Sequence, residues 1–275
     1  MVKNFIVILL VLGVACGQKN RRAFLPYVPG YNESMSVTRI LPGKLDEISG
    51  LFYQSDGRMA AINDEEGTIF FVDFKSEAEI QESIEFGKKA DYEEIVKVGN
   101  DYWVLESNGD LYQVSGPGKV NKYKTKEIKK TEFESMYHDQ ANNRLILLSK
   151  DHKEADRAIL AYAFDLGSYQ YNGKPIYEIS VRDIHYHTKN SSTQCKPSGA
   201  AIHPILNKLF IVASVGKMLL QCTLDGKVEK AYRINPVKFQ QPEGITFAPN
   251  GDMYISNEAA QGKATILMFP FENPL

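Results

Sequence analysis

The chain has 275 residues, of which 43% are hydrophobic and 24% are charged, and its formal net charge is −2 at pH 7. This composition provides enough apolar material for one large domain or two smaller ones. Because the chain has no basic surplus, it is not expected to bind nucleic acid.

The first 16 residues, MVKNFIVILLVLGVAC, are predicted to be a targeting segment outside the folded domain. One early charge, Lys3, precedes an apolar run that is too short to span a bilayer, as is typical of a secretory signal peptide. The small residues ending in Cys16 resemble a lipobox, although Gly13 stands where that motif usually has Leu, Val or Ile. The segment therefore predicts a bacterial envelope protein held on a membrane surface by a lipid on Cys16. Ordinary signal-peptidase cleavage and an uncleaved anchor are the alternatives.

Residues 17–33 would then form a polar tether, and residues 34–275 the folded domain, which we expect to be monomeric. Two cysteines remain in this domain, Cys195 and Cys222, and an oxidising compartment would allow them to pair. Cys195 precedes one predicted strand and Cys222 lies in the second strand after it, so the two need not be neighbours. A disulfide and two free thiols therefore both stay open.

Five similar segments follow one another along the domain, beginning at Leu45, Asp91, Glu132, Lys196 and Gln241. They recur about every 40 to 50 residues, except that the third is lengthened by an insertion at 168–193. Each segment contains a first strand, a turn such as Asp56-Gly57 or Asn250-Gly251, an almost continuously apolar second strand, and a third strand. Such repeats without helical periodicity predict the blades of a β-propeller.

The predicted fold is therefore all-β, a single propeller with five blades. Six blades are the alternative, if the insertion contributes to a blade of its own. SMSVTRILP, residues 34–42, is an extra strand before the first repeat. It is predicted to complete the last blade, because that closes the ring and removes an exposed edge.

Three segments, LDEISGLFY, KPSGAAIHPILNKLF and QPEGITFAPNGDMYISNE, resemble the SdiA-regulated domain family of bacterial envelope proteins. The resemblance covers roughly residues 40–270. It implies a β-propeller similar to NHL and TolB-like repeats, and it suggests calcium binding. It implies a fold more than a biochemical activity.

Alignment of the repeats predicts which side chains meet at the propeller axis, because the innermost strands line the channel. The first slot collects Ser49, Glu93, Glu134, Ser198 and Glu243. A second slot, predicted at the channel mouth, collects Asp64, Glu106, Lys150, Ser214 and Glu258. Glu47 lies two residues before Ser49, so strand alternation directs it to the same face.

The carboxylates Glu47, Glu93, Glu134 and Glu243 form a hypothetical ligand set for a divalent cation. Oxygen ligands without clustered histidines favour Ca²⁺ or Mg²⁺ over zinc. The alternative is a structural acidic ring that accepts backbone hydrogen bonds and has Lys150 and Lys196 as ionic partners.

Other candidates are weaker. His185 and His187 alternate in a segment predicted to be extended, which would direct both to one face, although such a pair is more often surface decoration. The tyrosines of the insertion could form an exposed aromatic patch; they are Tyr169, Tyr171, Tyr177 and Tyr186.

The leading functional hypothesis is a lipid-anchored module that binds an envelope ligand or protein and is not an enzyme. The chain contains no Gly-x-Ser-x-Gly, His-Glu-x-x-His or phosphate-binding glycine loop. A Ca²⁺-dependent hydrolase of phosphoesters, esters or lactones is the alternative, with its site on the axis. A third reading is a rigid scaffold that contacts another protein through its insertion.

Overall fold

The computed structural model describes residues 28–272, with the exception of 127 and 129. The predicted signal peptide, the lipidation residue Cys16 and the tether up to residue 27 lie outside these residues. Among the helices that are described, none combines the length and the apolar character needed to cross a membrane.

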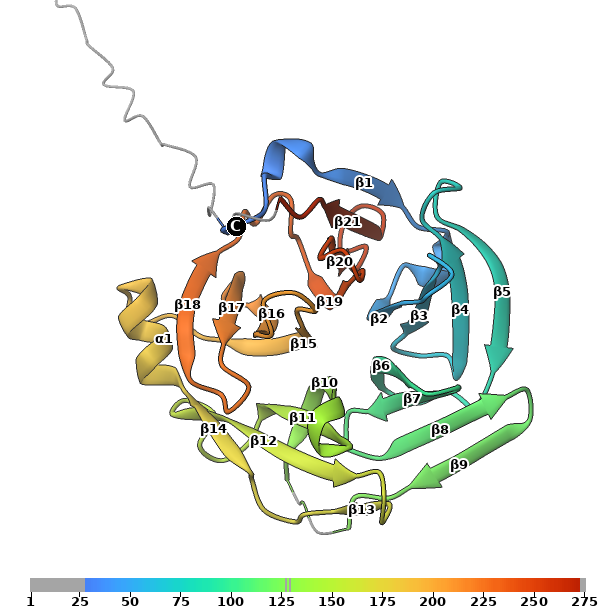
Figure 1. The fold of residues 1–275 in the computed structure, drawn as a ribbon, viewed down its shortest axis with the longest axis horizontal. Coiled ribbons are helices and arrows are strands. Elements are labelled where there is room, and N and C mark those ends of the chain that lie inside the picture. Colours follow the sequence, from blue (N-terminus) through green and yellow to red (C-terminus); the bar gives the residue numbers. More distant parts are fainter. Residues whose placement is uncertain (1–27, 127, 129, 273–275) are drawn as a thin grey trace, which may run out of the picture.

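Five antiparallel sheets surround a central axis as the blades of a propeller (Figure 1). Each blade has its first strand at the axis, and the predicted five-bladed fold is confirmed. The first blade contains β2 (Ile48–Tyr53), β3 (Met59–Asn63), β4 (Thr68–Asp73) and β5 (Glu79–Glu85), and the second contains β6 (Tyr92–Val98), β7 (Asp101–Glu106), β8 (Leu111–Gly116) and β9 (Lys119–Tyr123). The third blade contains β10 (Glu132–Asp139), β11 (Arg144–Asp151), β12 (Ala158–Asp165), β13 (Gln170–Tyr171) and β14 (Tyr177–Ser180). The fourth contains β15 (Lys196–Ile202), β16 (Leu209–Val215), β17 (Met218–Cys222) and β18 (Val228–Arg233), and the last contains β19 (Pro242–Phe247), β20 (Met253–Asn257), β21 (Thr265–Phe269) and β1 (Val37–Ile40).

The ring is closed by the N-terminal strand, as predicted. Val37 to Ile40 of β1 pair with Met268 to Thr265 of β21, so the last blade combines both ends of the domain. The innermost strands contact one another around the whole axis, from β2 through β6, β10, β15 and β19 back to β2. No innermost strand is therefore left without a neighbour on either side.

The first four blades have further, outer strands that the three-strand repeat did not predict. These outer strands carry few apolar residues; in β5, for example, five of the seven residues are exposed. In the third blade the insertion supplies the outer strands, because β13 and β14 both pair with β12. The insertion thus completes a blade instead of forming a sixth.

One prediction for the insertion is wrong. Residues Val181–Thr188 form helix α1, and Ser180 caps its first turn by accepting a hydrogen bond from the N–H of Asp183. Side chains two residues apart on a helix point about 200° from each other, so His185 and His187 do not share a face. Their Nε2 atoms contact different carbonyls, those of Thr193 and Val228.

The tyrosines of the insertion are likewise separated. The Tyr177 hydroxyl contacts that of Tyr137 in the blade core. Tyr169 stacks on Tyr123 with 5.3 Å between ring centroids, whereas Tyr186 is 78% exposed on α1. The predicted continuous aromatic patch does not form.

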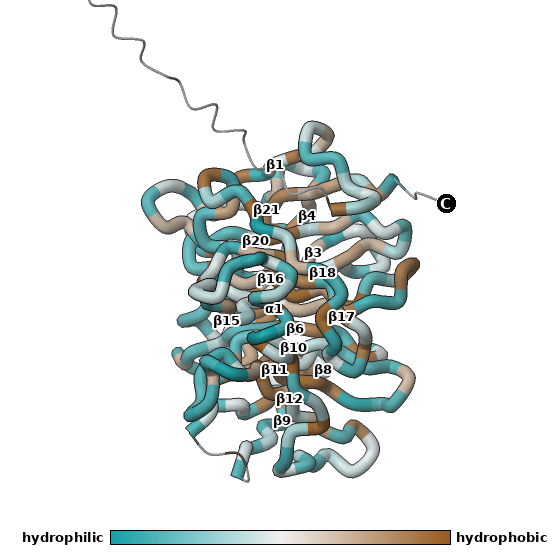
Figure 2. The backbone as a smooth tube through the Cα atoms, turned by 90° about the vertical axis from the view of Figure 1, so that its left-hand side faces the viewer, coloured by the Kyte–Doolittle hydropathy of each residue, from teal (hydrophilic) through white to brown (hydrophobic). Residues whose placement is uncertain are grey.

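Apolar residues follow the strands through the body of the ring, and most projecting loops are polar (Figure 2). The second strands are buried along almost their whole length, as in β3 and β20. Cys195 and Cys222 lie in one core cluster between the third and fourth blades, and both are free thiols. Burial raises the pKa of Cys195 to about 12.

Candidate functional site

Acidic side chains converge at one end of the central channel, in a cavity of about 340 Å³ that we call the acidic funnel. Its charged lining consists of Glu47, Asp64, Asp91, Glu93, Glu132, Glu134, Glu243 and Glu258 together with Lys150 and Lys196. All four carboxylates of the hypothetical ligand set are among them. Eight carboxylic side chains thus face only two lysines.

Four funnel residues could have been found by extending the reasoning applied to Glu47. Each lies two residues before a first-slot residue on an innermost strand, so strand alternation directs it to the channel. They are Asp91, Glu132, Lys196 and Gln241. The funnel therefore has a third slot of equivalent positions, and Glu47 is the member of this slot that was predicted from strand alternation.

Glu106, predicted at the channel mouth, lies outside the funnel. Glu106 pairs with Tyr92 in the register of the second blade. The residue of the first blade that is equivalent to Tyr92 is Ile48, and Ile48 pairs with Asn63. Glu106 thus corresponds to Asn63, and the position of Asp64 is taken in the second blade by Ser107. A shift of one residue turns a side chain to the opposite face of a strand. The Glu106 carboxylate accepts hydrogen bonds from Tyr112 and Lys122, each at 2.7 Å.

The two lysines of the funnel both have acidic partners. The Lys150 ammonium contacts the Glu134 carboxylate directly and lies 4.0 Å from that of Glu132. Lys196 donates to Asp151 at 2.9 Å. Glu134, one of the hypothetical metal ligands, therefore already has a cationic partner.

On the other side the carboxyl groups have little cationic compensation. Burial and the carboxylate of Asp91 raise the pKa of Glu93 to about 8. Burial raises the pKa of Glu243 to about 7, against the hydrogen bond from Ser214 and the charge of Lys150. Burial and a hydrogen bond with Glu47 raise the pKa of Glu258 to about 7.

Asp64 completes this group, and its environment is the least satisfied. Burial, with the nearby carboxylates of Glu47 and Glu65, raises the pKa of Asp64 to about 6. Its Oδ1 atom is buried and has no hydrogen-bond partner among the described residues. By contrast, Glu243 accepts from Ser214 at 3.1 Å and Glu258 from Gln241 at 2.9 Å. Burial and the neighbouring carboxyl groups thus favour the protonated form of these four side chains over the charged form.

The chemistry of the funnel suits a hard cation, because its charged side chains that are not paired with a lysine all offer carboxylate oxygens as metal ligands. Within the described residues, however, no three His, Cys, Asp or Glu side chains are grouped as a ready-made metal site. A cation in the funnel would therefore keep part of its water shell. A cavity of about 340 Å³ has room for this water, which occupies about 30 Å³ per molecule.

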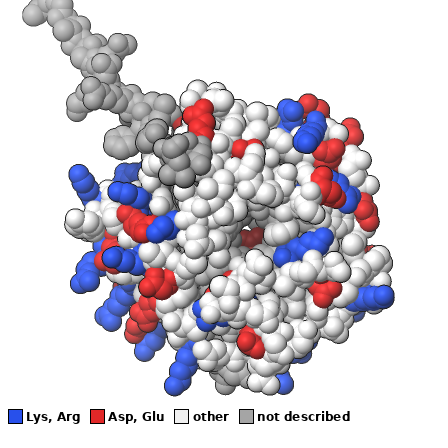
Figure 3. All heavy atoms as spheres, viewed as in Figure 1, with Lys and Arg blue, Asp and Glu red and all other residues white. Residues whose placement is uncertain are grey.

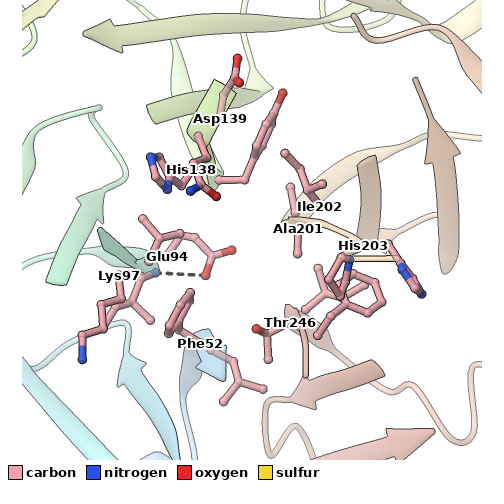
Figure 4. Close-up of a pocket in the computed structure, with 18 of the residues that line it drawn as sticks. Phe52, Glu94, Lys97, His138, Asp139, Ala201, Ile202, His203 and Thr246 are labelled. Carbon is pink, nitrogen blue, oxygen red and sulfur yellow. Dashed lines mark hydrogen bonds between the residues drawn. The ribbon is translucent and has the colours of Figure 1, made fainter. Parts of the chain in front are cut away.

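The other end of the channel opens into a larger cavity of about 820 Å³, which we call the apolar chamber. Seen along the axis, the ring is hollowed at its centre, and acidic atoms are visible inside the hollow (Figure 3). Apolar side chains line this chamber together with polar and charged ones, which include Glu94, Lys97, His138, Asp139 and His203 (Figure 4). Its neighbour Glu93 lines the funnel, so adjacent residues of β6 reach opposite ends of the channel.

A β-bulge explains this arrangement. The pairing of every innermost strand is interrupted at this point, in β6 between Tyr92 and Glu94. The extra residue breaks the alternation of side chains, so both Glu93 and Glu94 face the axis. Sequence reasoning that assumed uninterrupted alternation missed Glu94.

Comparison with known proteins agrees with this fold. A model of the family described as SdiA-regulated matches residues 25–260. No curated protein sequence matches the chain.

Several solved structures share the architecture. Regucalcin from Agrobacterium tumefaciens, described as a calcium-binding protein, is 9% identical with a TM-score of 0.54, over 86% of this chain and 95% of its own. A streptogramin B lyase is 14% identical with a TM-score of 0.51, over 85% and 97%. The aldose sugar dehydrogenase of Streptomyces coelicolor, bound to PQQ, is 11% identical with a TM-score of 0.50, over 86% and 98%. At these identities the similarity establishes the propeller fold alone.

Proposed function

The chain belongs to the SdiA-regulated family, and from this premise we propose that it is a binding module of the bacterial envelope whose acidic funnel holds a divalent cation. Ca²⁺ is the cation that fits this proposal best, because the donors are carboxylate oxygens. Attachment through a lipid on Cys16 is part of the same proposal. It would hold the propeller at a membrane surface without a spanning helix.

One observation carries the proposal. Glu93, Glu243 and Glu258 have pKa values of about 8, 7 and 7, and Asp64 has one of about 6. Such values indicate carboxyl groups that are buried and have too little positive charge nearby to offset that burial. A divalent cation would supply that charge and displace the protons that these groups share.

A calcium-dependent hydrolase would place its cation in the same funnel. The solved propellers that are enzymes share only the fold with this chain, so they favour neither activity. We therefore limit the proposal to binding.

The test is thermal unfolding of the chain beginning at residue 17, at pH 7.5, with EDTA or with millimolar Ca²⁺. Ligand at 100 times its Kd stabilises a protein by about 2.7 kcal/mol. At about 2–4 °C per kcal/mol for a domain of this size, Tm should rise by about 5–10 °C. Calorimetry at pH 7 should also detect protons released as Ca²⁺ binds.

Asp64→Asn and Glu243→Gln should lose most of the Ca²⁺-dependent rise in Tm. Glu106→Gln is the matched control, because Glu106 lies outside the funnel, and it should keep the full rise. An unchanged Tm of the parent chain with Ca²⁺, or a rise that persists in both funnel variants, would refute the proposal.

A further inference from the structure

The outer edge of the last blade exposes three large apolar side chains. Val237 and Ile40 are 79% and 62% exposed, more than any other large aliphatic side chain among the described residues, and Met35 is 48% exposed. Ile40 is the last residue of β1, Met35 ends the 3₁₀ turn before β1, and Val237 lies in the loop from β18 to β19. We call these three residues the apolar edge.

A lysine holds the two segments of the apolar edge together. The Lys238 Nζ donates a hydrogen bond to the Ser36 Oγ at 2.5 Å, and Val237 and Met35 are the chain neighbours of these two residues. Ile40 follows Ser36 by four residues of extended chain, or about 13 Å. The three side chains are therefore grouped along one edge, and grouped exposed apolar residues mark a surface of interaction.

The charged side chains of the same segments are paired with one another. The Glu33 carboxylate lies 3.6 Å from the Lys238 Nζ. Arg39 lies 3.5 Å from the Glu77 carboxylate and donates to the carbonyl of Phe74. Because these charges compensate each other, the edge suits an apolar surface better than a charged one.

The chain enters the described domain at this edge. Val28, the first residue that the structure describes, is buried and lines a small cavity together with Glu33 and Phe239. Residues 17–27 can span at most about 40 Å. A domain of this size is about 45 Å across. The opposite edge, at β13 (Figure 1), is therefore too far away to rest on a membrane that holds Cys16.

We propose that the apolar edge rests on the membrane to which the chain is attached, with its three side chains inserted at the boundary between lipid headgroups and acyl chains. Docking of this kind rests on the attachment through Cys16 that is part of the proposed function. Attachment keeps the edge close to the lipid, so an apolar contact that is weak by itself is sufficient. The propeller would stand on its rim, and both ends of its channel would stay open to water.

The two faces of the ring fit a lipid surface less well. The funnel end presents carboxylic side chains, which are costly to transfer out of water. The chamber end exposes Ile205 and Leu224, but only to 43% and 36%. Ile205 is therefore the position that tests docking through the chamber face.

The test uses the chain beginning at residue 17 with an N-terminal hexahistidine tag, held on phosphatidylcholine vesicles that contain a nickel-chelating lipid. A polarity-sensitive NBD label is attached through Val237→Cys, with Ile205→Cys and Gln170→Cys, an exposed position of β13, as comparisons. Cys195 and Cys222 are buried, which directs the label to the introduced thiol. On attachment, the emission of the Val237 label should shift to shorter wavelength, whereas the two comparison labels should keep their emission.

Ile40→Glu, introduced into the chain labelled at position 237, should abolish the shift, because a carboxylate is costly to bury at the lipid boundary. Tyr186→Glu is the matched control. Tyr186 is 78% exposed on α1, outside the apolar edge, so the shift should persist. Both replaced side chains are exposed, and an unchanged Tm checks that each variant is folded.

Unchanged emission of the Val237 label on attachment would overturn the proposal, as would an equal shift of the Gln170 or Ile205 label. A shift without vesicles, together with a dimer in sedimentation, would assign the edge to a second copy of the chain. A shift that needs anionic lipid and disappears at high salt would replace apolar insertion by electrostatic attraction. Because the tag replaces the lipid, docking is tested whether or not Cys16 is lipidated, and the mass of the protein extracted from membranes tests the lipid separately.

Discussion

Single residues on the innermost strands decide how closely the blades approach the axis. Gly50 shows this most directly, because a Cβ atom added there would lie 2.7 Å from the Ile95 nitrogen and 2.8 Å from the Glu94 Cα. Both atoms belong to the backbone of the next blade, so neither can move without shifting a strand. The glycine of the Ser-Gly pair is thus required by packing between blades.

Gly50→Ala should lower the free energy of unfolding by about 1–3 kcal/mol, the usual cost of overpacking. Gly262→Ala is the matched control, since its nearest atom, the Ala259 oxygen, would lie 3.7 Å from the new Cβ. It should change stability by no more than about 0.5 kcal/mol. Urea unfolding of both variants checks the prediction, and equal midpoints would contradict it.

Among the elements, the N-terminal strand holds the first and last blades together. Beyond the pairing of β1 with β21, the Tyr31 hydroxyl donates to the carbonyl of Gly251 at 2.7 Å. The Arg39 Nε donates to the carbonyl of Phe74 in the first blade at 3.2 Å. The segment thus satisfies the edge of β21 and bridges two blades.

A chain that begins at residue 42 should consequently lose at least about 10 °C in Tm, at about 2–4 °C for each kcal/mol. It would also expose β21 as an unpaired edge, which favours aggregation. A chain that begins at residue 28 retains β1 and should unfold at the temperature of the chain beginning at residue 17. Calorimetry of the three chains would contradict the role of β1 if all of them unfolded together.

At the scale of the whole molecule, the acidic funnel couples stability to pH. Glu93, Glu243 and Glu258 have pKa values of about 8, 7 and 7, above the ordinary glutamate value of 4.5. Between pH 4.5 and 8 the folded chain therefore binds more protons at these groups than the unfolded chain. Stability consequently falls as pH rises through this window.

Without divalent cations, Tm should fall by at least about 3 °C between pH 6.5 and pH 8, because each kcal/mol of lost unfolding free energy lowers Tm by about 2–4 °C. Below pH 6.5 the opposite effect of His203 enters, because burial lowers the pKa of this residue to about 4. Glu93→Gln should reduce the slope and raise Tm at pH 8. A Tm that is flat or rises over this range would contradict the funnel electrostatics.

The repeated pattern of the sequence was sufficient to predict five blades, closure by residues 34–42 and most of the acidic funnel. These features depend on local alternation, which places a side chain on one face of a strand wherever the chain continues. The outer strands were missed because few of their residues are apolar. Helix α1 was missed because its two histidines were interpreted as alternating along an extended strand, although Val181 and Ile184 are buried at helical spacing.

The tertiary structure decided the rest. Bulges in the innermost strands interrupt alternation, and they bring Glu94 to the axis beside Glu93. Strand register places Glu106 outside the funnel. Glu134 is paired with Lys150, whereas Glu93 and Glu243 form no ion pair within the part of the chain that the structure describes. The physical reason is that the sequence determines which face of a strand a residue occupies, whereas the depth of that residue along the axis and its charged neighbours depend on how five blades meet.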